Sequence, residues 1–261
     1  MGRESQFHDG LGQHDGRSGT SNDPFLCVLT SNGDLRQTIL LDQGRVAQRR
    51  RRANILATAR HMVAQKGREG FVLKEVAETC GVSVQTIYNL IGDRSSVLAT
   101  AVNDYVVASF DYATGSEAYP NVFLGLAEMF GRSALVAPDY IREASIGYFS
   151  GDQEYRQMIR AGAMRIYSDA LARMKRSGEL RQSTEIQPLA YRFTCLAAVM
   201  VFDWAIGVRT QREMNDDLVA SYAGLLREAL VPASAERVQR WMDERSKAGM
   251  ANAHQTQGQN T

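Results

Sequence analysis

The stretch of sequence that decides the fold is VLKEVAETCGVSVQTIYNLI, residues 72–91. Apolar side chains recur there at helical spacing in two short blocks, residues 73–79 and 84–90. Between the blocks, Gly81 suits a left-handed turn, and Ser83 is a favourable N-cap for the second block. Two short helices joined by a glycine-containing turn form a helix-turn-helix unit, which we therefore expect here.

The second of these helices is expected to present a polar outer face, with Ile87 and either Leu90 or Ile91 pointing inward. A helix fits the major groove of B-DNA, where the base edges display distinct donor and acceptor patterns. Gln and Asn amides can pair with adenine, and Thr and Val can contact the methyl group of thymine. The expected DNA contacts are therefore Val84, Gln85, Thr86 and Asn89, with Tyr88 long enough to reach a phosphate.

Positive charge is concentrated just before this unit. The whole chain has a net charge of +1, but the segment from Gln43 to Arg68 contains eight Lys and Arg residues and no Asp or Glu. A first helix is expected from about residue 49 to residue 66, with a run of four arginines at its start. Such a run can lie along phosphates or reach into the minor groove; the alternative is a solvated run of charge. The arginines are Arg49, Arg50, Arg51 and Arg52.

The rest of the sequence predicts an all-α protein, because helical periodicity persists and no alternating strands separated by turns occur. A helix is expected to begin near Asp93 or Arg94. Further helices are expected over residues 121–135, 139–149, 153–175, 188–208, 216–230 and 235–247.

This organisation predicts four parts along the chain. Residues 1–44 are polar with little periodicity, which predicts a disordered N-terminal extension. Residues 45–100 are expected to form a three-helix DNA-binding domain that contains the helix-turn-helix. Residues 101–232 are expected to form a larger helical domain. Residues 233–261 should hold a short helix followed by a disordered tail.

The region from residue 50 to residue 100 resembles the DNA-binding domain of the tetracycline-repressor (TetR) family of transcriptional regulators. The resemblance rests on continuous, gap-free spacing of Ile55, Leu56, Ala59, Gly67, Glu75, Val76, Ala77, Gly81, Val82, Ser83, Thr86, Ile87, Tyr88, Val97 and Leu98. It implies a homodimeric regulator, by resemblance a repressor, that binds palindromic double-stranded operator DNA.

Three positions depart from the family's usual pattern. Val72 stands where the family usually has a Ser or Thr N-cap, so the helix that follows should lack a side-chain cap. Ile91 replaces a usual Phe and keeps an apolar anchor. Arg94 replaces a usual Lys; it keeps the charge and is expected to bond a phosphate.

The C-terminal half carries more apolar surface than one helical face requires. The helix expected from Pro188 is apolar nearly all round and must be covered on all sides. In the family, the last two long helices of each subunit form an intersubunit four-helix bundle, so the resemblance implies dimerisation there. The alternative is a core helix of a monomer. The expected interface is Leu189, Phe193, Leu196, Met200, Trp204, Leu218, Tyr222, Leu225 and Leu226.

The resemblance also implies that residues 101–232 form a ligand-binding and dimerisation domain, and that a small apolar ligand changes the affinity for DNA. Aromatic and Met residues at helical spacing serve equally well as ordinary core, so two alternatives stay open: a helix-turn-helix regulator of architectural type without an inducer, and a protein-interaction module with this fold. The residues expected to line the pocket are Phe123, Met129, Phe130, Tyr140, Phe149, Met164, Tyr167 and Met174.

Signals for catalysis, metals, cofactors and membranes are missing from the sequence. No Gly-rich phosphate loop or Gly-x-Ser-x-Gly motif is present. Three cysteines without paired spacing and the absence of a long apolar run predict a cytoplasmic, non-membrane protein with reduced thiols. The four histidines are scattered and pair with no Cys, Asp or Glu at ligand spacing, so neither an enzyme nor a metal site is expected; they are His8, His14, His61 and His254.

Overall fold

The structure, a computed structural model, describes residues 43–150 and 153–257, which form ten α-helices. The first three are α2 (Gln43–Lys66), α3 (Leu73–Cys80) and α4 (Val84–Leu90). The others are α5 (Arg94–Gly115), α6 (Val122–Val136), α7 (Pro138–Phe149), α8 (Gln153–Arg176), α9 (Ile186–Ala205), α10 (Gln211–Arg227) and α11 (Pro232–Gln257). The prediction of an all-α fold is confirmed across these residues, whose only β-type pairing is one isolated bridge between Leu180 and Leu230.

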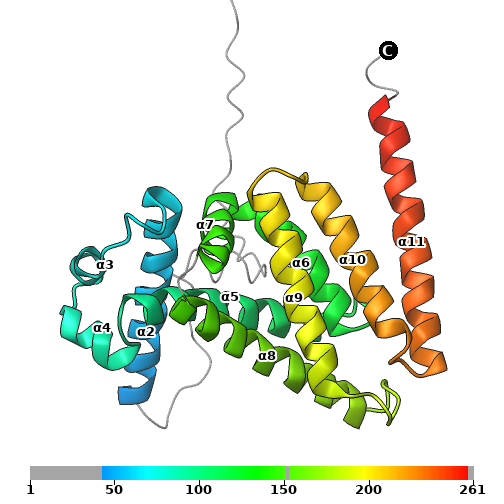
Figure 1. The fold of residues 1–261 in the computed structure, drawn as a ribbon, viewed down its shortest axis with the longest axis horizontal. Coiled ribbons are helices and arrows are strands. Elements are labelled where there is room, and N and C mark those ends of the chain that lie inside the picture. The colour runs from blue at the N-terminus through cyan, green and yellow to red at the C-terminus, as the bar shows by residue number, and fades with distance from the viewer. Residues whose placement is uncertain (1–42, 151–152, 258–261) are drawn as a thin grey trace, which may run out of the picture.

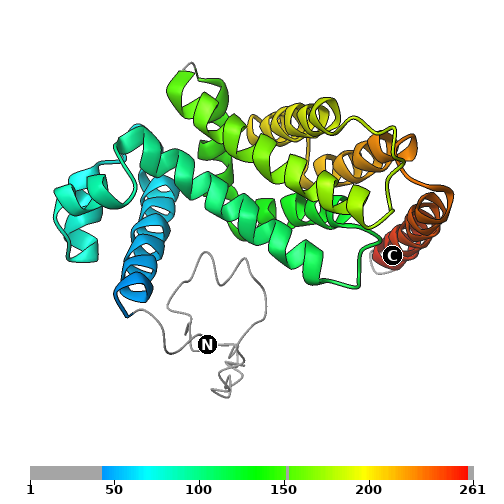
Figure 2. The ribbon, with the colours of Figure 1, turned by 90° about the horizontal axis from the view of Figure 1, so that it is seen from below.

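The helices are arranged as a small group at one end and a larger group at the other (Figure 1). Helices α2, α3 and α4 pack on one another, and α2 also packs on α5 and α7. Helix α5 leads from the small group into the larger one, where it lies against α8 and α6 (Figure 2). Helix α9 packs between α7, α8 and α10, so the larger group is a layered helical bundle.

Side-chain caps fix where several helices begin. The Ser83 hydroxyl accepts a hydrogen bond from the backbone N–H of Thr86, which confirms the predicted N-cap of α4. At α5, the Asp93 carboxylate accepts from the backbone N–H of Ser96 at 2.8 Å, and this hydrogen bond lowers the pKa of Asp93. Helix α3 begins after Val72 without a side-chain cap, as the sequence predicts.

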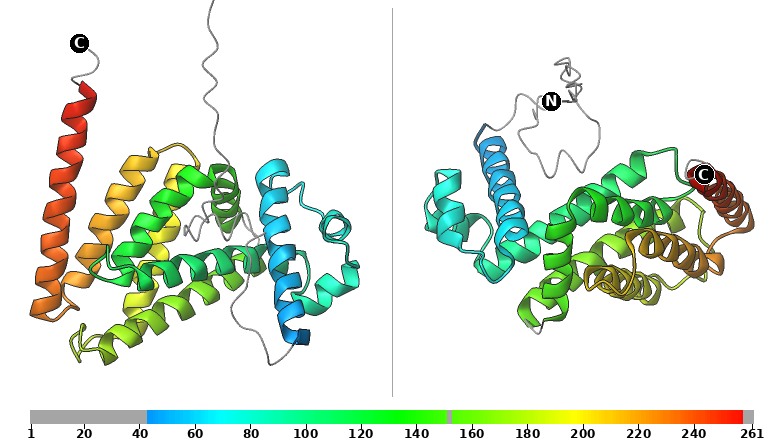
Figure 3. Two further views of the ribbon diagram at one scale, coloured as in Figure 1. Left: turned by 180° about the vertical axis from the view of Figure 1, so that it is seen from behind. Right: turned by 90° about the horizontal axis from the view of Figure 1, so that it is seen from above.

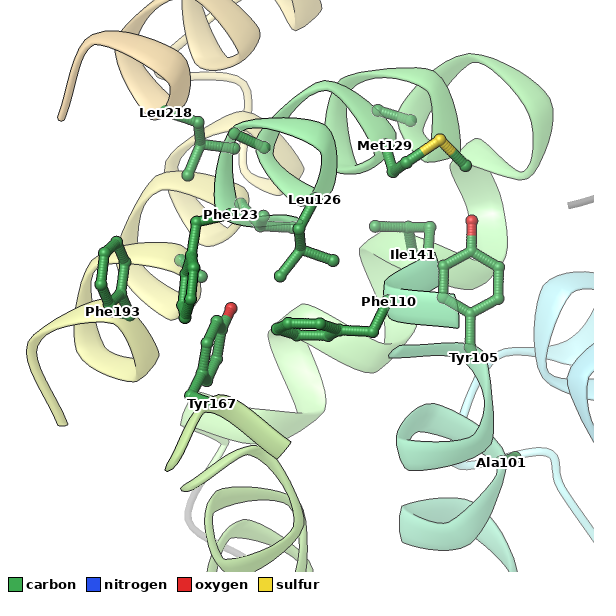
Figure 4. Packing of buried hydrophobic residues seen from close by; sticks show 14 of the residues in the cluster. Ala101, Tyr105, Phe110, Phe123, Leu126, Met129, Ile141, Tyr167, Phe193 and Leu218 are labelled. Atoms are coloured by element: carbon green, nitrogen blue, oxygen red, sulfur yellow. The ribbon is translucent and has the colours of Figure 1, made fainter. Parts of the chain in front are cut away.

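The core of the larger group is built around stacked aromatic rings (Figure 4). The Phe123 ring of α6 lies 4.4 Å from that of Phe193 on α9 and 5.8 Å from that of Tyr167 on α8, measured between centroids. The buried hydroxyls of Tyr167 and Tyr222 share a hydrogen bond of 2.8 Å, which joins α8 to α10. Burial raises the pKa of both phenols, so both stay protonated and the pair stays neutral.

Helix boundaries differ from expectation at both ends of the described chain. Helix α2 starts at Gln43 rather than near residue 49, and α11 runs to Gln257 rather than ending near residue 247. Both added segments consist mainly of good helix formers such as Ala, Arg, Gln and Met. The expected domain boundary at residue 100 falls inside α5, which continues without a break. Residues 1–42 of the extension predicted to be disordered lie outside the described residues. Residues 248–257, predicted to belong to a disordered tail, form the end of α11, so that prediction is wrong for them.

Two side chains join the last helix, α11, to the rest of the protein. The Trp241 indole N–H donates to the backbone oxygen of Ala118 at 3.1 Å, and the Arg245 guanidinium bridges Glu128 of α6 and Asp216 of α10. None of the described helices combines the length and the apolar character needed to cross a bilayer.

Replacing Tyr222 by Phe should lower the free energy of unfolding by about 1–3 kcal/mol, because the Tyr167 hydroxyl is then buried without its partner. The double variant Tyr167→Phe with Tyr222→Phe should lose less than the sum of the two single changes. Urea unfolding followed by circular dichroism measures this coupling. Strict additivity would contradict a hydrogen bond between the two phenols.

Candidate functional site

Helix α4 lies at the outer end of the small group, away from α6, α9 and α10 in both views of Figure 3. Its inward side chain Ile87 is completely buried, whereas Gln85, Tyr88 and Asn89 are exposed. Val84 and Thr86 are half-buried. The Tyr88 side chain, 49% exposed, is a large apolar group that the protein's own core leaves uncovered.

The turn before α4 has the geometry that its glycine allows. Gly81 adopts φ 64° and ψ 36°, a left-handed conformation, and its backbone N–H donates to Glu78 at 3.2 Å. The next N–H, from Val82, donates to Ala77 at 2.9 Å, which closes the end of α3. Helix α3 is thereby terminated abruptly and α4 starts in a new direction, as a helix-turn-helix requires.

The outer face of α4 carries two amides that are already oriented. The Gln85 Nε2 donates to the Asn89 Oδ1 at 3.0 Å, one helical turn away. This contact leaves the Gln85 Oε1 as an acceptor and the Asn89 Nδ2 as a donor. Together these atoms offer the acceptor and donor pair that the major-groove edge of an adenine complements.

The four arginines lie inside α2, which begins at Gln43, rather than at the start of the first helix as the sequence predicted. Consecutive helical residues point about 100° apart, so four in a row cannot share one face. Arg49, Arg50 and Arg51 are exposed. Arg52 is turned toward the protein and forms an ion pair with Asp104 of α5 at 3.2 Å. Only part of this run is therefore directed to solvent.

Arg94 is engaged with the protein's own backbone. Its Nε donates to the carbonyl of Phe71 at 3.2 Å, its Nη2 donates to the carbonyl of Arg68, and its guanidinium lies 5.9 Å from the centroid of the Phe71 ring. These contacts join the start of α5 to the loop between α2 and α3. A structural role thus accompanies any phosphate contact at this position.

Most of the expected dimer interface lies inside the protomer. A helix such as α9, which is apolar on two faces, buries one face in the core of its own protomer. Sequence periodicity alone does not identify which face that is. The stripe chosen from the sequence is mainly the inner one. Six of its residues are buried in the protomer and unavailable to a partner, namely Leu189, Phe193, Trp204, Leu218, Tyr222 and Leu226, whereas Leu196, Met200 and Leu225 are half-buried.

The outer face of α9 is apolar and exposed. Tyr191 and Val199 on α9 are 44% and 48% exposed, and Ile206, the residue that follows its end, is 50% exposed. On the neighbouring helix α10, Ala220 and Gly224 are exposed, and nothing lies within 4 Å of where a Gly224 side chain would begin. Small residues of this kind allow a second helix to approach closely.

A cavity of about 120 Å³ lies between α5, α6, α7, α8 and α9. Three of the expected pocket residues line it: Phe130, Tyr140 and Tyr167. The other five do not. Phe123, Met129 and Met174 are buried in the core, Met164 is half-buried beside Thr194, and Phe149 is 40% exposed against Phe202.

Sequence reasoning missed most of the cavity wall. The cavity is lined by small residues, by tyrosines and by one arginine. The spacing of these residues in the sequence does not indicate a cavity. The wall is assembled from five helices, so no local pattern reports it. The missed residues include Tyr105, Ser145, Tyr148, Arg160, Thr194 and Ala197.

Within the described part of the chain, no group of three or more His, Cys, Asp or Glu side chains is arranged to hold a metal ion. His61 lies exposed on α2, and His8 and His14 fall outside the described residues. Cys80 is half-buried, with its thiol 3.3 Å from the Thr58 hydroxyl.

Replacing Arg94 by Ala should destabilise the small helical group by about 1–3 kcal/mol, because two backbone carbonyls lose a charged donor. Replacing the exposed Tyr88 by Ala should change the free energy of unfolding by less than about 0.5 kcal/mol. Chemical denaturation of both variants compares them. Equal stabilities would contradict the structural role of Arg94.

The solved structures with a similar arrangement of helices include TetR-family transcriptional regulators. TylP, a TetR regulator from Streptomyces fradiae, has 16% identity and a TM-score of 0.56 over 80% of this chain and 94% of its own. A protein from Syntrophomonas wolfei assigned to the TetR family has 16% identity and a TM-score of 0.51 over 68% of this chain and 95% of its own.

A third protein assigned to the TetR family, from Rhodococcus sp., has 21% identity and a TM-score of 0.50 over 67% of this chain and 97% of its own. No protein-family model and no curated protein sequence matches the chain. From the small helical group with its helix-turn-helix to the larger bundle around a cavity, the described part of this chain has the fold of the TetR-family transcriptional regulators.

Proposed function

We propose that this chain is a TetR-type transcriptional regulator that acts in the cytoplasm. In this proposal it binds palindromic operator DNA as a homodimer and is released by a small molecule in its cavity. The observation that carries the proposal is the outer face of α4, where Gln85, Tyr88 and Asn89 are exposed while Ile87 anchors the helix in the core.

Direct readout would come from α4 and affinity from α2. The free acceptor of Gln85 and the free donor of Asn89 match an adenine edge, while Thr86 and Val84 suit a thymine methyl. The exposed Arg49, Arg50 and Arg51 supply positive charge near the phosphates. Phosphate contacts set the position on the duplex and base contacts set the sequence preference.

Dimerisation would use the outer faces of α9 and α10. The apolar side chains of Tyr191, Val199 and Ile206 meet the small residues Ala220 and Gly224 when two copies pack around a two-fold axis. A two-fold axis also places two copies of α4 about one DNA turn apart, roughly 34–36 Å, which a palindromic site requires.

Ligand control would pass through the contact between α2 and the cavity wall. Arg60 of α2 is buried, and desolvation lowers its pKa against the opposing effect of Tyr140, Asp104 and Tyr105. Tyr140 and Tyr105 also line the cavity. An occupant that shifts these tyrosines changes the surroundings of a buried charge in the DNA-binding half. A ligand that weakens DNA binding must itself bind less well to the DNA complex.

Selection from a random DNA pool should return a palindrome, and Gln85→Ala should relax base preference at one position in each half-site. The expected loss of discrimination there is about 1–3 kcal/mol. Arg50→Gln should instead weaken all sequences alike and reduce the salt slope by about one. Fluorescence anisotropy at several salt concentrations measures both effects, and Arg240→Gln on α11 is the control.

Binding without a steep salt dependence, or no binding at all, would favour the alternative of a protein-interaction module. DNA binding that responds to no ligand would favour a regulator without an inducer.

Val199→Asp should convert the dimer to a monomer and lower operator affinity at least tenfold, because a carboxylate would be buried against the partner's apolar face. The matched control is Val107→Asp, since Val107 is 41% exposed and belongs to α5 rather than to α9 or α10. Sedimentation velocity measures the oligomeric state. A Val199→Asp protein that stays dimeric would place the interface elsewhere.

A further inference from the structure

The cavity wall combines an apolar lining with a few polar groups at its ends. Most of the lining comes from aliphatic side chains and aromatic rings of α5, α7, α8 and α9. Its volume, about 120 Å³, is close to the roughly 150 Å³ of an apolar protein cavity that accepts benzene. One aromatic ring is therefore about the largest apolar body that the cavity holds without rearrangement.

Arg160 of α8 is the charged residue in this lining. Its guanidinium lies 4.8 Å from the centroid of the exposed Tyr191 ring, which holds it at the rim. Among the residues that the structure describes, no carboxylate pairs with Arg160. A cation without a paired acid, placed at the mouth of an apolar cavity, favours an occupant with a negative charge at one end.

Tyr140 of α7 provides a second polar group. Its side chain is 4% exposed and lines the cavity, yet its hydroxyl has no hydrogen-bond partner within the described part of the chain. Burial raises its pKa far above the ordinary value for a phenol, so the hydroxyl remains a donor. Buried polar groups in proteins are almost always hydrogen-bonded, so this one needs a partner that the described chain does not supply.

The charged groups that act on Tyr140 are Arg60 and Asp104, and Arg160 is not among them. The charge of Arg160 acts on Tyr148, which lines the same cavity. Tyr140 and Tyr148 are eight residues apart on α7, which corresponds to a rise of about 12 Å. An occupant that satisfies both ends therefore carries its two polar groups on opposite sides of an apolar body.

We propose that the cavity binds a monocyclic aromatic carboxylate, with the carboxylate against Arg160 and a hydrogen-bond acceptor on the opposite side of the ring facing the Tyr140 hydroxyl. The inference rests on the ligand-binding part of the proposed function and specifies the chemical class of the ligand. It replaces a purely apolar inducer by an amphiphilic anion.

Titration calorimetry on the full chain without DNA tests the charge, with benzoate, 4-hydroxybenzoate and uncharged benzamide as probes. Benzoate should bind at least tenfold more tightly than benzamide. Arg160→Gln should remove that preference and leave benzamide binding unchanged. The matched control is Arg165→Gln, which alters an exposed arginine on the same helix that does not line the cavity and should change nothing.

Tyr140→Phe tests the far end and removes only the hydroxyl. This variant should bind 4-hydroxybenzoate about tenfold more weakly and benzoate as tightly as the parent does. Its circular dichroism spectrum should match that of the parent. Equal binding of benzoate and benzamide, or no binding of either carboxylate at millimolar concentration, would overturn the inference. Operator binding by the same preparation separates the outcomes. DNA binding without carboxylate binding refutes this inference alone, whereas carboxylate binding without DNA binding refutes the regulator.

Discussion

The buried residue Arg68 holds the small helical group of α2, α3 and α4 against the rest of the protein. Its backbone N–H donates to the Glu143 carboxylate of α7 at 2.9 Å, its Nη1 donates to the Ser150 hydroxyl at 3.0 Å, and its charge lies 4.5 Å from the centroid of the Tyr155 ring on α8. Its carbonyl accepts from Arg94 of α5. A charge removed from water requires such partners, so the relative positions of the helices that supply them are constrained together.

This constraint couples the position of the small helical group to that of the larger bundle. Gly67, with φ 69°, lies directly after α2 and close to Glu143 of α7. A Cβ added to Gly67 would lie 3.3 Å from the Glu143 carboxylate. Arg60, one and a half to two helical turns before it, carries its charge to the back of the cavity wall. The surface that would meet DNA and the space that would hold a ligand therefore share buried cations rather than a flexible linker.

Local chemistry in the sequence was enough to predict the helix-turn-helix, because Gly81, Ser83 and Ile87 act on residues within one turn of themselves. The core stripe of α9 was taken for a dimer interface because a helix that is apolar all round offers two apolar faces with the same period. Arg94 was predicted to contact a phosphate, and Arg68 entered only as one charge of the basic segment, since the partners of both lie 23 or more positions away in the chain. The cavity is likewise made by residues from five helices, so no single stretch of sequence could report it.

Helix α5 is continuous and can therefore transmit a displacement from one end to the other. Its 22 residues extend about 33 Å, from Arg94 beside the helix-turn-helix, past Tyr105 at the cavity, to Gly115. A rod of that length that tilts by about 3° around its middle moves each end by nearly 1 Å. No glycine or proline interrupts α5 before its last residue, so local bending does not absorb a displacement at the cavity. The displacement therefore reaches the loop to which Arg94 is hydrogen-bonded.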